Sequence, residues 1–394
     1  QACFNLLPIY YAIAILIPIM AVIVALVVLL VVLGALSSYR LFKWYHAHKL
    51  QQATLLIQQR AREEIPADLV IPYQDLKMDV VIGAGSFSRV YRGRWKHTLV
   101  AIKELIALEQ LVIEQNGVSL QEMLGAPENS SQIQQAVEEF RAEVLVMSHL
   151  HHPNVLLLVG ACSELPHCCI VTEYLPNGSM YDALHRPGAK SSIPFSRQIQ
   201  WLLETASGMA YLHDVGLLHR DLKSLNVLLD DSNRAKLCDF GLAKLSAEVH
   251  ASASSSGGGT SGSMLWMAPE MLMDTAPFSF AADIYSWSIM GWEIMSPEEE
   301  LYPDISTAAL MQAVAIQHKR PTIHLAWPAA LCNLFQECWQ PNPEARPTFH
   351  TIITRLGATY PAASTALFPG GKDESYPTES TTSTYSPLNP LLQH

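Results

Sequence analysis

The feature that most constrains this 394-residue chain is a start without charge, because residues 1–39 contain no Asp, Glu, Lys or Arg. Residues 9–36 are almost wholly apolar, and a helix of that length extends about 42 Å, against roughly 30 Å for the hydrocarbon core of a bilayer. The run is apolar on every face, which argues against a core helix of a globular domain. A secretory signal peptide begins with basic residues, and residues 1–11 have none. We therefore expect one transmembrane helix over residues 9–36.

Basic residues follow the apolar run, and none precedes it. They are Arg40, Lys43, Lys49, Arg60 and Arg62. By the positive-inside rule the chain after the helix lies in the cytoplasm, so we expect a single-pass membrane protein. Residues 37–75 are expected to link the membrane to the main domain. Residues 40–67 carry five bases and two acids, which suits either contact with anionic lipid or a solvated helical linker, and we favour the linker.

The composition of the whole chain limits its partners. The net charge is −11, which argues against a nucleic-acid partner because phosphate contacts need clustered Lys and Arg. Apolar residues make up 49% of the chain, which excludes disorder throughout. The seven Cys are too sparse for a disulfide scaffold, and no pair of CxxC motifs suggests zinc. Residues 358–394 are rich in Ser, Thr and Pro and are predicted to be a disordered tail.

Between these ends, the apolar pattern changes from strand-like to helical. Strand-like runs at residues 80–82, 90–94 and 100–102 are separated by turn residues. Apolar residues recur at helical spacing in residues 196–212 and 281–295. A β-rich first part and a helical second part predict an α+β fold of two lobes with a cleft between them.

A glycine-rich segment lies between the first two predicted strands. It reads Gly83-Ala84-Gly85-Ser86-Phe87-Ser88-Arg89-Val90. Glycines let a backbone approach a polyphosphate closely and free its N–H groups to bind phosphate oxygens. The signal is weak by itself, because Gly-x-Gly turns are common, Ser88 stands where a third glycine is expected, and no helix follows.

A lysine at the end of the third predicted strand, Lys103, is the next candidate. Its charge is costly at the end of an apolar strand unless it meets a partner, and a snorkelling edge lysine is the alternative without function. Glu143 is the preferred partner, because apolar residues around it recur at helical spacing. Glu138 and Glu139 remain rivals, since a polar loop insertion precedes this helix.

Three further motifs follow in the second half. They are His219-Arg220-Asp221-Leu222-Lys223-Ser224-Leu225-Asn226, Asp239-Phe240-Gly241 and Ala268-Pro269-Glu270. Together with the glycine-rich segment and Lys103, in this order and spacing, they resemble a eukaryotic protein kinase domain over about residues 76–357. The resemblance implies a bilobal fold, with a β-rich lobe at about residues 76–174 and a helical lobe at about 175–357. It also implies ATP and Mg²⁺ as cofactors.

The resemblance implies a chemical role for each motif. Asp221 would orient the substrate hydroxyl, and Lys223 would neutralise the phosphoryl group during transfer. Lys103, paired with Glu143, would position the nucleotide. The metal ligands would be Asn226 and Asp239, and Asp239 is expected to be partly buried because it follows an apolar run. The nucleotide-binding residues would be Gly83, Ala84, Gly85, Ser86, Phe87, Val90, Ala101, Lys103, Thr172, Glu173, Leu175 and Leu228.

A second set of residues would hold this site in shape. These structural residues are His219, Arg220, Phe240, Gly241, Glu270, Asp283 and Arg346. In the family, His219 and Phe240 would be packing residues. Asp283 would anchor the catalytic-loop backbone, and Glu270 would pair with Arg346.

The catalytic loop indicates which hydroxyl is the acceptor. Lys223 stands two residues after Asp221, as in serine/threonine kinases, and the run 266–270 resembles the tyrosine-kinase-like group, including Raf-like and mixed-lineage-type kinases. We expect a membrane-anchored, receptor-like enzyme that phosphorylates Ser and Thr of proteins in signalling. Tyrosine specificity is disfavoured because of Lys223. A pseudokinase scaffold is disfavoured because every catalytic residue type is present. Dimerisation through the kinase domain or the transmembrane segment is left open.

The segment before Ala268 is rich in Ser and Gly, which indicates a flexible activation segment. The candidate phosphorylation sites are Ser254, Ser255, Ser256, Thr260 and Ser261. A phosphate there would pair with Arg220 and order the loop. The equally weighted alternative for each single residue is that it only solvates the loop.

Overall fold

The computed structural model describes residues 33–34, 37, 40, 65–84, 88–105, 137–138, 140–164, 167–239, 263–273 and 278–363. Within these ranges, no helix has the length and apolar character needed to cross a bilayer. The transmembrane helix expected at residues 9–36 lies outside the described residues apart from residues 33 and 34, which are helical. The insertion expected before Glu143 falls in the undescribed range 106–136.

The first part of the chain forms a five-stranded antiparallel sheet in the order β1-β2-β3-β5-β4. The strands are β1 (Leu76–Ala84), β2 (Ser88–Trp95), β3 (Thr98–Leu105), β4 (Leu158–Glu164) and β5 (His167–Glu173). Alternate residues of β3 are buried, so Val100 and Ile102 pack together on one face while Lys103 is directed to the other. Gly93 of β2 permits close strand packing, because a Cβ there would lie 2.5 Å from Ile102 and 2.6 Å from the Lys77 carbonyl.

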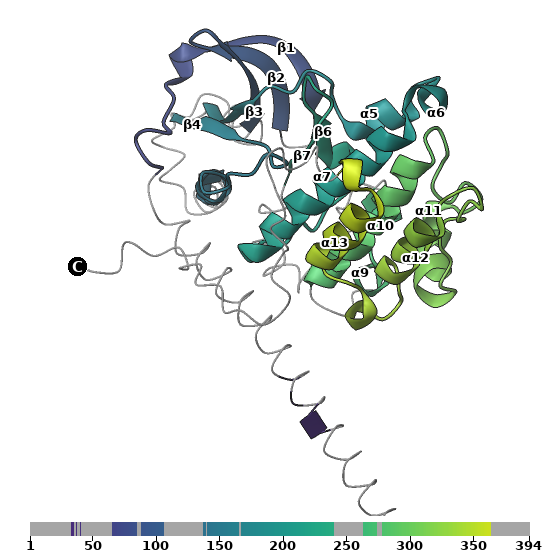
Figure 1. Ribbon diagram of the computed structural model, residues 1–394. Coiled ribbons are helices and arrows are strands. Elements are labelled where there is room, and N and C mark those ends of the chain that lie inside the picture. Colours follow the sequence, from purple (N-terminus) through teal and green to yellow (C-terminus); the bar gives the residue numbers. More distant parts are fainter. Residues whose placement is uncertain are drawn as a thin grey trace, which may run out of the picture.

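The second part of the chain is helical and packs below the sheet, as Figure 1 shows. Its helices are α5 (Met180–His185), α6 (Ala189–Ser192), α7 (Phe195–Asp214), α9 (Pro269–Leu272), α10 (Phe280–Met295), α11 (Thr307–Met311), α12 (Ala329–Cys338) and α13 (Phe349–Thr359). Short turns are η1 (Tyr73–Asp75), η2 (Ser224–Asn226), η4 (Ser263–Trp266), η5 (Gln312–Ile316) and η6 (Pro343–Ala345), and a hairpin joins β6 (Val227–Leu229) to β7 (Ala235–Leu237). The predicted β-rich lobe and helical lobe are therefore confirmed.

Helix α10 forms the centre of the helical lobe. Thirteen of its sixteen residues are buried, so it is surrounded by protein and not amphipathic. The hydroxyl of Ser279 caps it by accepting the Ala282 N–H at 3.3 Å. Helices α7 and α12 pack against it. This arrangement gives the loop between α7 and β6 a rigid base.

The ordered part of the chain continues beyond the boundary expected after residue 357. Helix α13 ends at Thr359, and residues 361–363 are helical again. Tyr360 and Ala363 pack against the main core, which accounts for the extension. The prediction of disorder from residue 358 is therefore wrong for residues 358–363, and residues 364–394 lie outside the described ranges.

A buried carboxylate in α7 makes stability depend on pH. Glu204 is 1% exposed, and burial raises its pKa to about 7, although the Ala235 N–H at 2.7 Å and the Gln200 amide at 2.9 Å stabilise the ionised form. The folded state thus binds this proton more tightly than the unfolded chain does. The protonated Glu204 therefore adds to the free energy of unfolding. This contribution is complete below about pH 4.5 and is lost as pH rises to about 7, which lowers the free energy of unfolding by ~3 kcal/mol.

We expect Glu204→Gln to remove this pH dependence, because the amide has the same shape and carries no charge. Urea unfolding at pH 5 and pH 8 measures it, with the exposed Glu300→Gln as the matched control. The stability of the wild type should fall more between the two pH values than that of Glu204→Gln. Equal changes in both proteins would contradict the assignment.

Candidate functional site

Lys103 of β3 joins three segments that are far apart in the sequence. Its Nζ lies 3.1 Å from Glu143 Oε1 and 3.3 Å from Asp239 Oδ1. Glu143 belongs to the helical residues 140–147, whose Phe140 is buried in the core. The structure therefore places Glu143 against Lys103; of its two rivals, Glu139 lies outside the described residues. The contacts of Lys103 with Glu143 and Asp239 thus join the sheet, this helix and the segment just after β7.

The charges in this cluster stabilise one another. Burial by itself would lower the pKa of Lys103, but the carboxylates of Glu143 and Asp239 raise it above its usual value. Lys103 in turn holds the pKa of Asp239 below its usual value. The cluster is therefore one cation between two carboxylates at neutral pH, with one negative charge in excess.

The Asp239 side chain is more exposed than the sequence suggests. It is 58% exposed, whereas we expected partial burial because of the apolar residues before it. The reason is local: Asp239 has φ 54°, a left-handed conformation that turns it away from the buried strand β7. One carboxylate oxygen contacts Lys103, and the exposed carboxylate remains accessible to a cation.

The loop between α7 and β6 brings three of the predicted catalytic groups together. Lys223 Nζ lies 2.8 Å from Asp221 Oδ2. Asn226 Nδ2 donates to the Asp221 carbonyl at 2.8 Å and to its Oδ2 at 3.1 Å. Because the Asn226 amide nitrogen is occupied, its oxygen is the atom left for a cation. The Asp221 side chain is 22% exposed, so a substrate can reach it.

Asp283 of α10 fixes the backbone of this loop. Its carboxylate is 3% exposed and accepts the N–H groups of His219 and Arg220, each at 2.9 Å. Arg220 has φ 68°, a costly conformation for a residue with a side chain, and these two bonds hold it there. His213 Nε2 lies 3.0 Å from the same carboxylate. Sequence reasoning missed His213, because it lies outside every motif and 70 residues from Asp283.

Glu293 is a second residue that sequence reasoning missed. It is 1% exposed within α10, and its carboxylate accepts the Ser224 hydroxyl at 2.8 Å and the Trp266 indole N–H at 3.0 Å. His185 Nε2 lies 2.8 Å away. Glu293 thus ties the catalytic loop to the segment after the expected activation loop. An acid within an otherwise apolar helical run was the available signal.

The residues expected around the nucleotide occupy neighbouring strands. Val90 of β2 pairs with Lys103, and Ala101 of β3 pairs with Thr172 of β5. Gly83 and Ala84 lie at the end of β1, and they pair with Val90 and Arg89 of β2. Leu175 and Leu228 pack into a small apolar cluster where β5 meets the β6–β7 hairpin. Its buried members are Leu156, Leu175 and Cys238.

Glu173, at the end of β5, has a side-chain partner that the motifs did not predict. Lys236 of β7 contacts both of its carboxylate oxygens, at 2.7 and 2.9 Å. The Glu173 side chain also accepts the Leu157 N–H at 2.9 Å. These contacts tie the end of β5 to the hairpin that carries Asn226 and Asp239 at its two ends.

Several predicted residues lie outside the described ranges. They are Gly85, Ser86, Phe87, Phe240, Gly241, Ser254, Ser255, Ser256, Thr260 and Ser261. His219 is described and is fully buried, as expected for a packing residue. Burial lowers the pKa of its imidazole, so the ring is neutral at pH 7.

Glu270 and Arg346 form the ion pair that the sequence predicts. Both terminal nitrogens of Arg346 contact the carboxylate, at 2.7 and 2.8 Å, and the arginine side chain is 0% exposed. Its remaining donors bind the carbonyls of Ala281 and Gln340. The geometry is bidentate, with the guanidinium fully buried and the carboxylate 10% exposed.

We expect Arg346→Met to lower the free energy of unfolding by about 3–5 kcal/mol, because the largely buried Glu270 carboxylate would lose the cation that pairs with it. Denaturant unfolding followed by circular dichroism measures the loss. The matched control is Arg355→Met, because its pair with Glu337 is 48% and 45% exposed and contributes ~1 kcal/mol or less. Similar losses in both variants would contradict the role of the buried pair.

The donor set beside Lys103 suits Mg²⁺. Asn226 and Asp239 offer an amide oxygen and a carboxylate, and Mg²⁺ takes one or two protein oxygens together with substrate phosphates and water. Among the described residues there is no group of three or more His, Cys, Asp or Glu that could hold a metal alone. The residues therefore fit an ion that enters with a nucleotide.

Comparison with known proteins agrees with this geometry. The family described as protein tyrosine and serine/threonine kinase matches residues 76–356. A Dictyostelium discoideum protein named "Probable serine/threonine-protein kinase" is 37% identical over 74% of this chain and 28% of its own length. The Arabidopsis thaliana serine/threonine-protein kinase CTR1 is 35% identical over 73% of this chain and 32% of its own length. The Arabidopsis thaliana serine/threonine/tyrosine-protein kinase HT1 is 32% identical over 75% of this chain and 68% of its own length.

The extent of these matches defines what is shared. The chain spans about a third or less of the Dictyostelium protein and of CTR1, so the shared part is one domain of longer proteins. That domain includes Lys103, Asp221, Asn226 and Asp239. The chain belongs to the protein tyrosine and serine/threonine kinase family.

Proposed function

We propose that the protein transfers the γ-phosphate of ATP to Ser and Thr hydroxyls of other proteins. The observation that carries this proposal is the contact of Lys103 Nζ with both Glu143 and Asp239. The cation expected to position the nucleotide, Lys103, contacts the carboxylate expected to bind the metal, Asp239, although the two residues are 136 positions apart in the sequence. Phosphoryl transfer depends on this kind of positioning, since its transition state spreads negative charge over phosphate oxygens.

Each side chain of the site then has a defined role in phosphoryl transfer. Asp221 accepts a hydrogen bond from the substrate hydroxyl and aims its oxygen at the γ-phosphorus. Lys223, 2.8 Å from Asp221, places a positive charge beside the phosphoryl group in transfer. Asn226 and Asp239 would hold Mg²⁺, which when bound would neutralise charge on the phosphates. Lys103 binds phosphate oxygens while Glu143 keeps its ammonium group in place.

Specificity for Ser and Thr rests on Lys223 and on the names of relatives. CTR1 is named a serine/threonine-protein kinase, whereas HT1 and shkC of Dictyostelium discoideum carry names that include tyrosine or dual specificity. We place the chain in the tyrosine-kinase-like group on the sequence run at 266–270. Phosphoamino-acid analysis after reaction with [γ-³²P]ATP, Mg²⁺ and a generic protein substrate tests this. Phosphoserine and phosphothreonine are expected. Phosphotyrosine as the only product would overturn the assignment.

We further propose that residues 9–36 anchor the kinase domain to a membrane, with residues 37–75 as linker and the domain in the cytoplasm. The uncharged sequence and the basic residues after it support this. Two relatives from Acanthamoeba polyphaga mimivirus have "kinase/receptor" in their names. Carbonate extraction of membranes from cells expressing the full chain tests the anchor. Recovery in the pellet is expected, and release into the supernatant would contradict it.

The candidate residues at 254–256, 260 and 261 would be targets of autophosphorylation, with Arg220 as the cation that binds the phosphate. Mass spectrometry of the chain after incubation with MgATP locates modified residues. Modification confined to other segments would remove this part of the proposal.

A further inference from the structure

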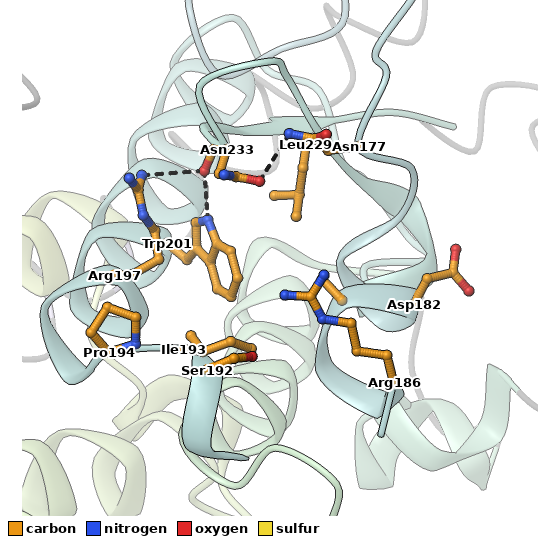
Figure 2. A pocket seen from close by; sticks show the side chains of 11 residues that line it. Asn177, Asp182, Arg186, Ser192, Ile193, Pro194, Arg197, Trp201, Leu229 and Asn233 are labelled. Atoms are coloured by element: carbon orange, nitrogen blue, oxygen red, sulfur yellow. Dashed lines mark hydrogen bonds between the residues drawn. The ribbon is translucent and has the colours of Figure 1, made fainter. Parts of the chain in front are cut away.

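A cavity of about 440 Å³ lies in the helical lobe, apart from the Lys103 and Asp221 cluster. It is bounded by α5, α6, the first turn of α7 and the β6–β7 hairpin (Figure 2). Its size falls in the range of ligand sites, roughly 300–1,000 Å³. Nothing in the proposed kinase mechanism uses it.

Three apolar side chains form part of the cavity floor. Ile193, Trp201 and Leu229 line it and are 8%, 3% and 1% exposed. The indole N–H of Trp201 donates to the Asn233 carbonyl at 2.8 Å, so this polar atom is already satisfied. Where a ligand touches these three side chains, which expose little of their surface, it therefore meets apolar atoms.

The rim of the cavity is positively charged. Figure 2 shows the Arg186 guanidinium directed into the cavity, whereas the carboxylate of Asp182 points away from it. Arg197 Nη1 donates to the Asn233 carbonyl at 3.3 Å. Within the described ranges, neither arginine is paired with a carboxylate. Within the described ranges both guanidinium groups thus line one cavity without an ion pair to a carboxylate, although the Glu204 carboxylate interacts with Arg197 at longer range.

This charge is unusual on a chain with a net charge of −11. Arginine presents a planar fork of N–H donors that matches a carboxylate or phosphate. The cavity therefore suits a segment that carries apolar groups close to acidic residues.

The described chain ends beside this cavity. The Tyr360 ring lies 5.8 Å from the ring of Phe195, the first residue of α7. The preceding residue, Pro194, lines the cavity. Residues 364–394 continue from this point. The eleven residues from 364 to 374 span up to about 36 Å when extended, so Asp373 and Glu374 can lie that far from Ala363.

The sequence after Ala363 carries both kinds of group. Leu367 and Phe368 are apolar, two glycines follow, and Asp373 and Glu374 are acidic. We propose that the tail of the chain binds its own cavity, with Leu367 and Phe368 on the apolar floor and the two acids on Arg186 and Arg197. The covalent connection favours this contact, because it keeps the segment at a high effective concentration.

Trypsin digestion of the full-length chain tests the proposal. Lys372 is the only Lys or Arg after Arg355, so cleavage there releases residues 373–394 and is followed by mass spectrometry. A synthetic peptide of residues 364–394 gives the rate for the unbound tail. Since charge-assisted hydrogen bonds contribute ~1.5–3 kcal/mol each, we expect cleavage of the wild type to be about tenfold slower than that of the peptide.

Arg186→Gln combined with Arg197→Gln should restore the rate of the free peptide. The matched control is Lys190→Gln, which removes a positive charge from α6 outside the cavity lining and should leave the protection intact. Wild-type cleavage as fast as the peptide, or protection that survives loss of both arginines, would overturn the proposal. Protection that disappears on dilution would assign the tail to a second copy and also contradict it.

A variant in the tail covers the case in which the arginine variants fold poorly. Asp373→Asn with Glu374→Gln changes no residue of the folded lobe. It should increase amide hydrogen exchange in residues 177–186 of the full chain, where the tail would otherwise lie. Unchanged exchange there would contradict binding of the acidic residues.

Discussion

Replacing Asp221 with Asn should lower kcat for phosphoryl transfer by about 1,000-fold, within the range expected for loss of a general base. The amide cannot accept the hydroxyl proton as a carboxylate does, and it no longer carries the charge that pairs with Lys223 at 2.8 Å. The substitution preserves the shape of the side chain, and the loop backbone is held separately by Asp283. ATP affinity and the unfolding midpoint should therefore stay unchanged.

The matched control for this variant is Asp231→Asn, an exposed acid in the β6–β7 hairpin that should leave transfer unchanged. Single-turnover transfer of ³²P to a protein substrate separates chemistry from product release. If the wild type and Asp221→Asn are equally inactive while both bind ATP, the chain is a binding module and not an enzyme.

Replacing Lys103 with Met should lower kcat for transfer by about 100- to 1,000-fold, the usual effect of removing one positive group from a charged transition state. Met retains the apolar stem in the sheet but leaves Glu143 and Asp239 without the cation between them. The nucleotide would lose its contact with the sheet, and the Asp239 carboxylate would lose one of its restraints.

Lys77→Met on β1 is the matched control, since this exposed strand lysine lies outside the Lys103 cluster. Circular dichroism and the unfolding midpoint verify that Lys103→Met remains folded. Turnover equal to that of the wild type would show that another lysine positions the nucleotide.

Part of this site could be predicted from short segments of sequence whose residues have a fixed spacing. The groups of residues 219–226 lie within one loop, so their mutual contacts follow from local sequence. The contact of Lys103 with Glu143 was also predictable, because a charge at the end of an apolar strand needs a partner and Glu143 lies on an apolar helix. These cases have one cause in common: a strong local signal leaves few alternatives.

Contacts between distant segments were not predictable in the same way. His213 and Glu293 reach the catalytic loop through packing of α7 and α10, and no spacing rule relates residues in different helices. The exposure of Asp239 depends on one left-handed φ angle, which the apolar sequence before it conceals. The charged cavity at Arg186 combines α5, α7 and a hairpin, so only the folded chain reveals it.

A structure of the chain with Mg²⁺ and a non-hydrolysable ATP analogue tests the central claim most directly. We predict Lys103 Nζ within hydrogen-bond distance of the phosphates, and Mg²⁺ bound by the Asn226 amide oxygen and an Asp239 carboxylate oxygen. The γ-phosphorus should face the Asp221 carboxylate. A nucleotide bound elsewhere, or one that Lys103 and Asp239 cannot contact together, would contradict the account.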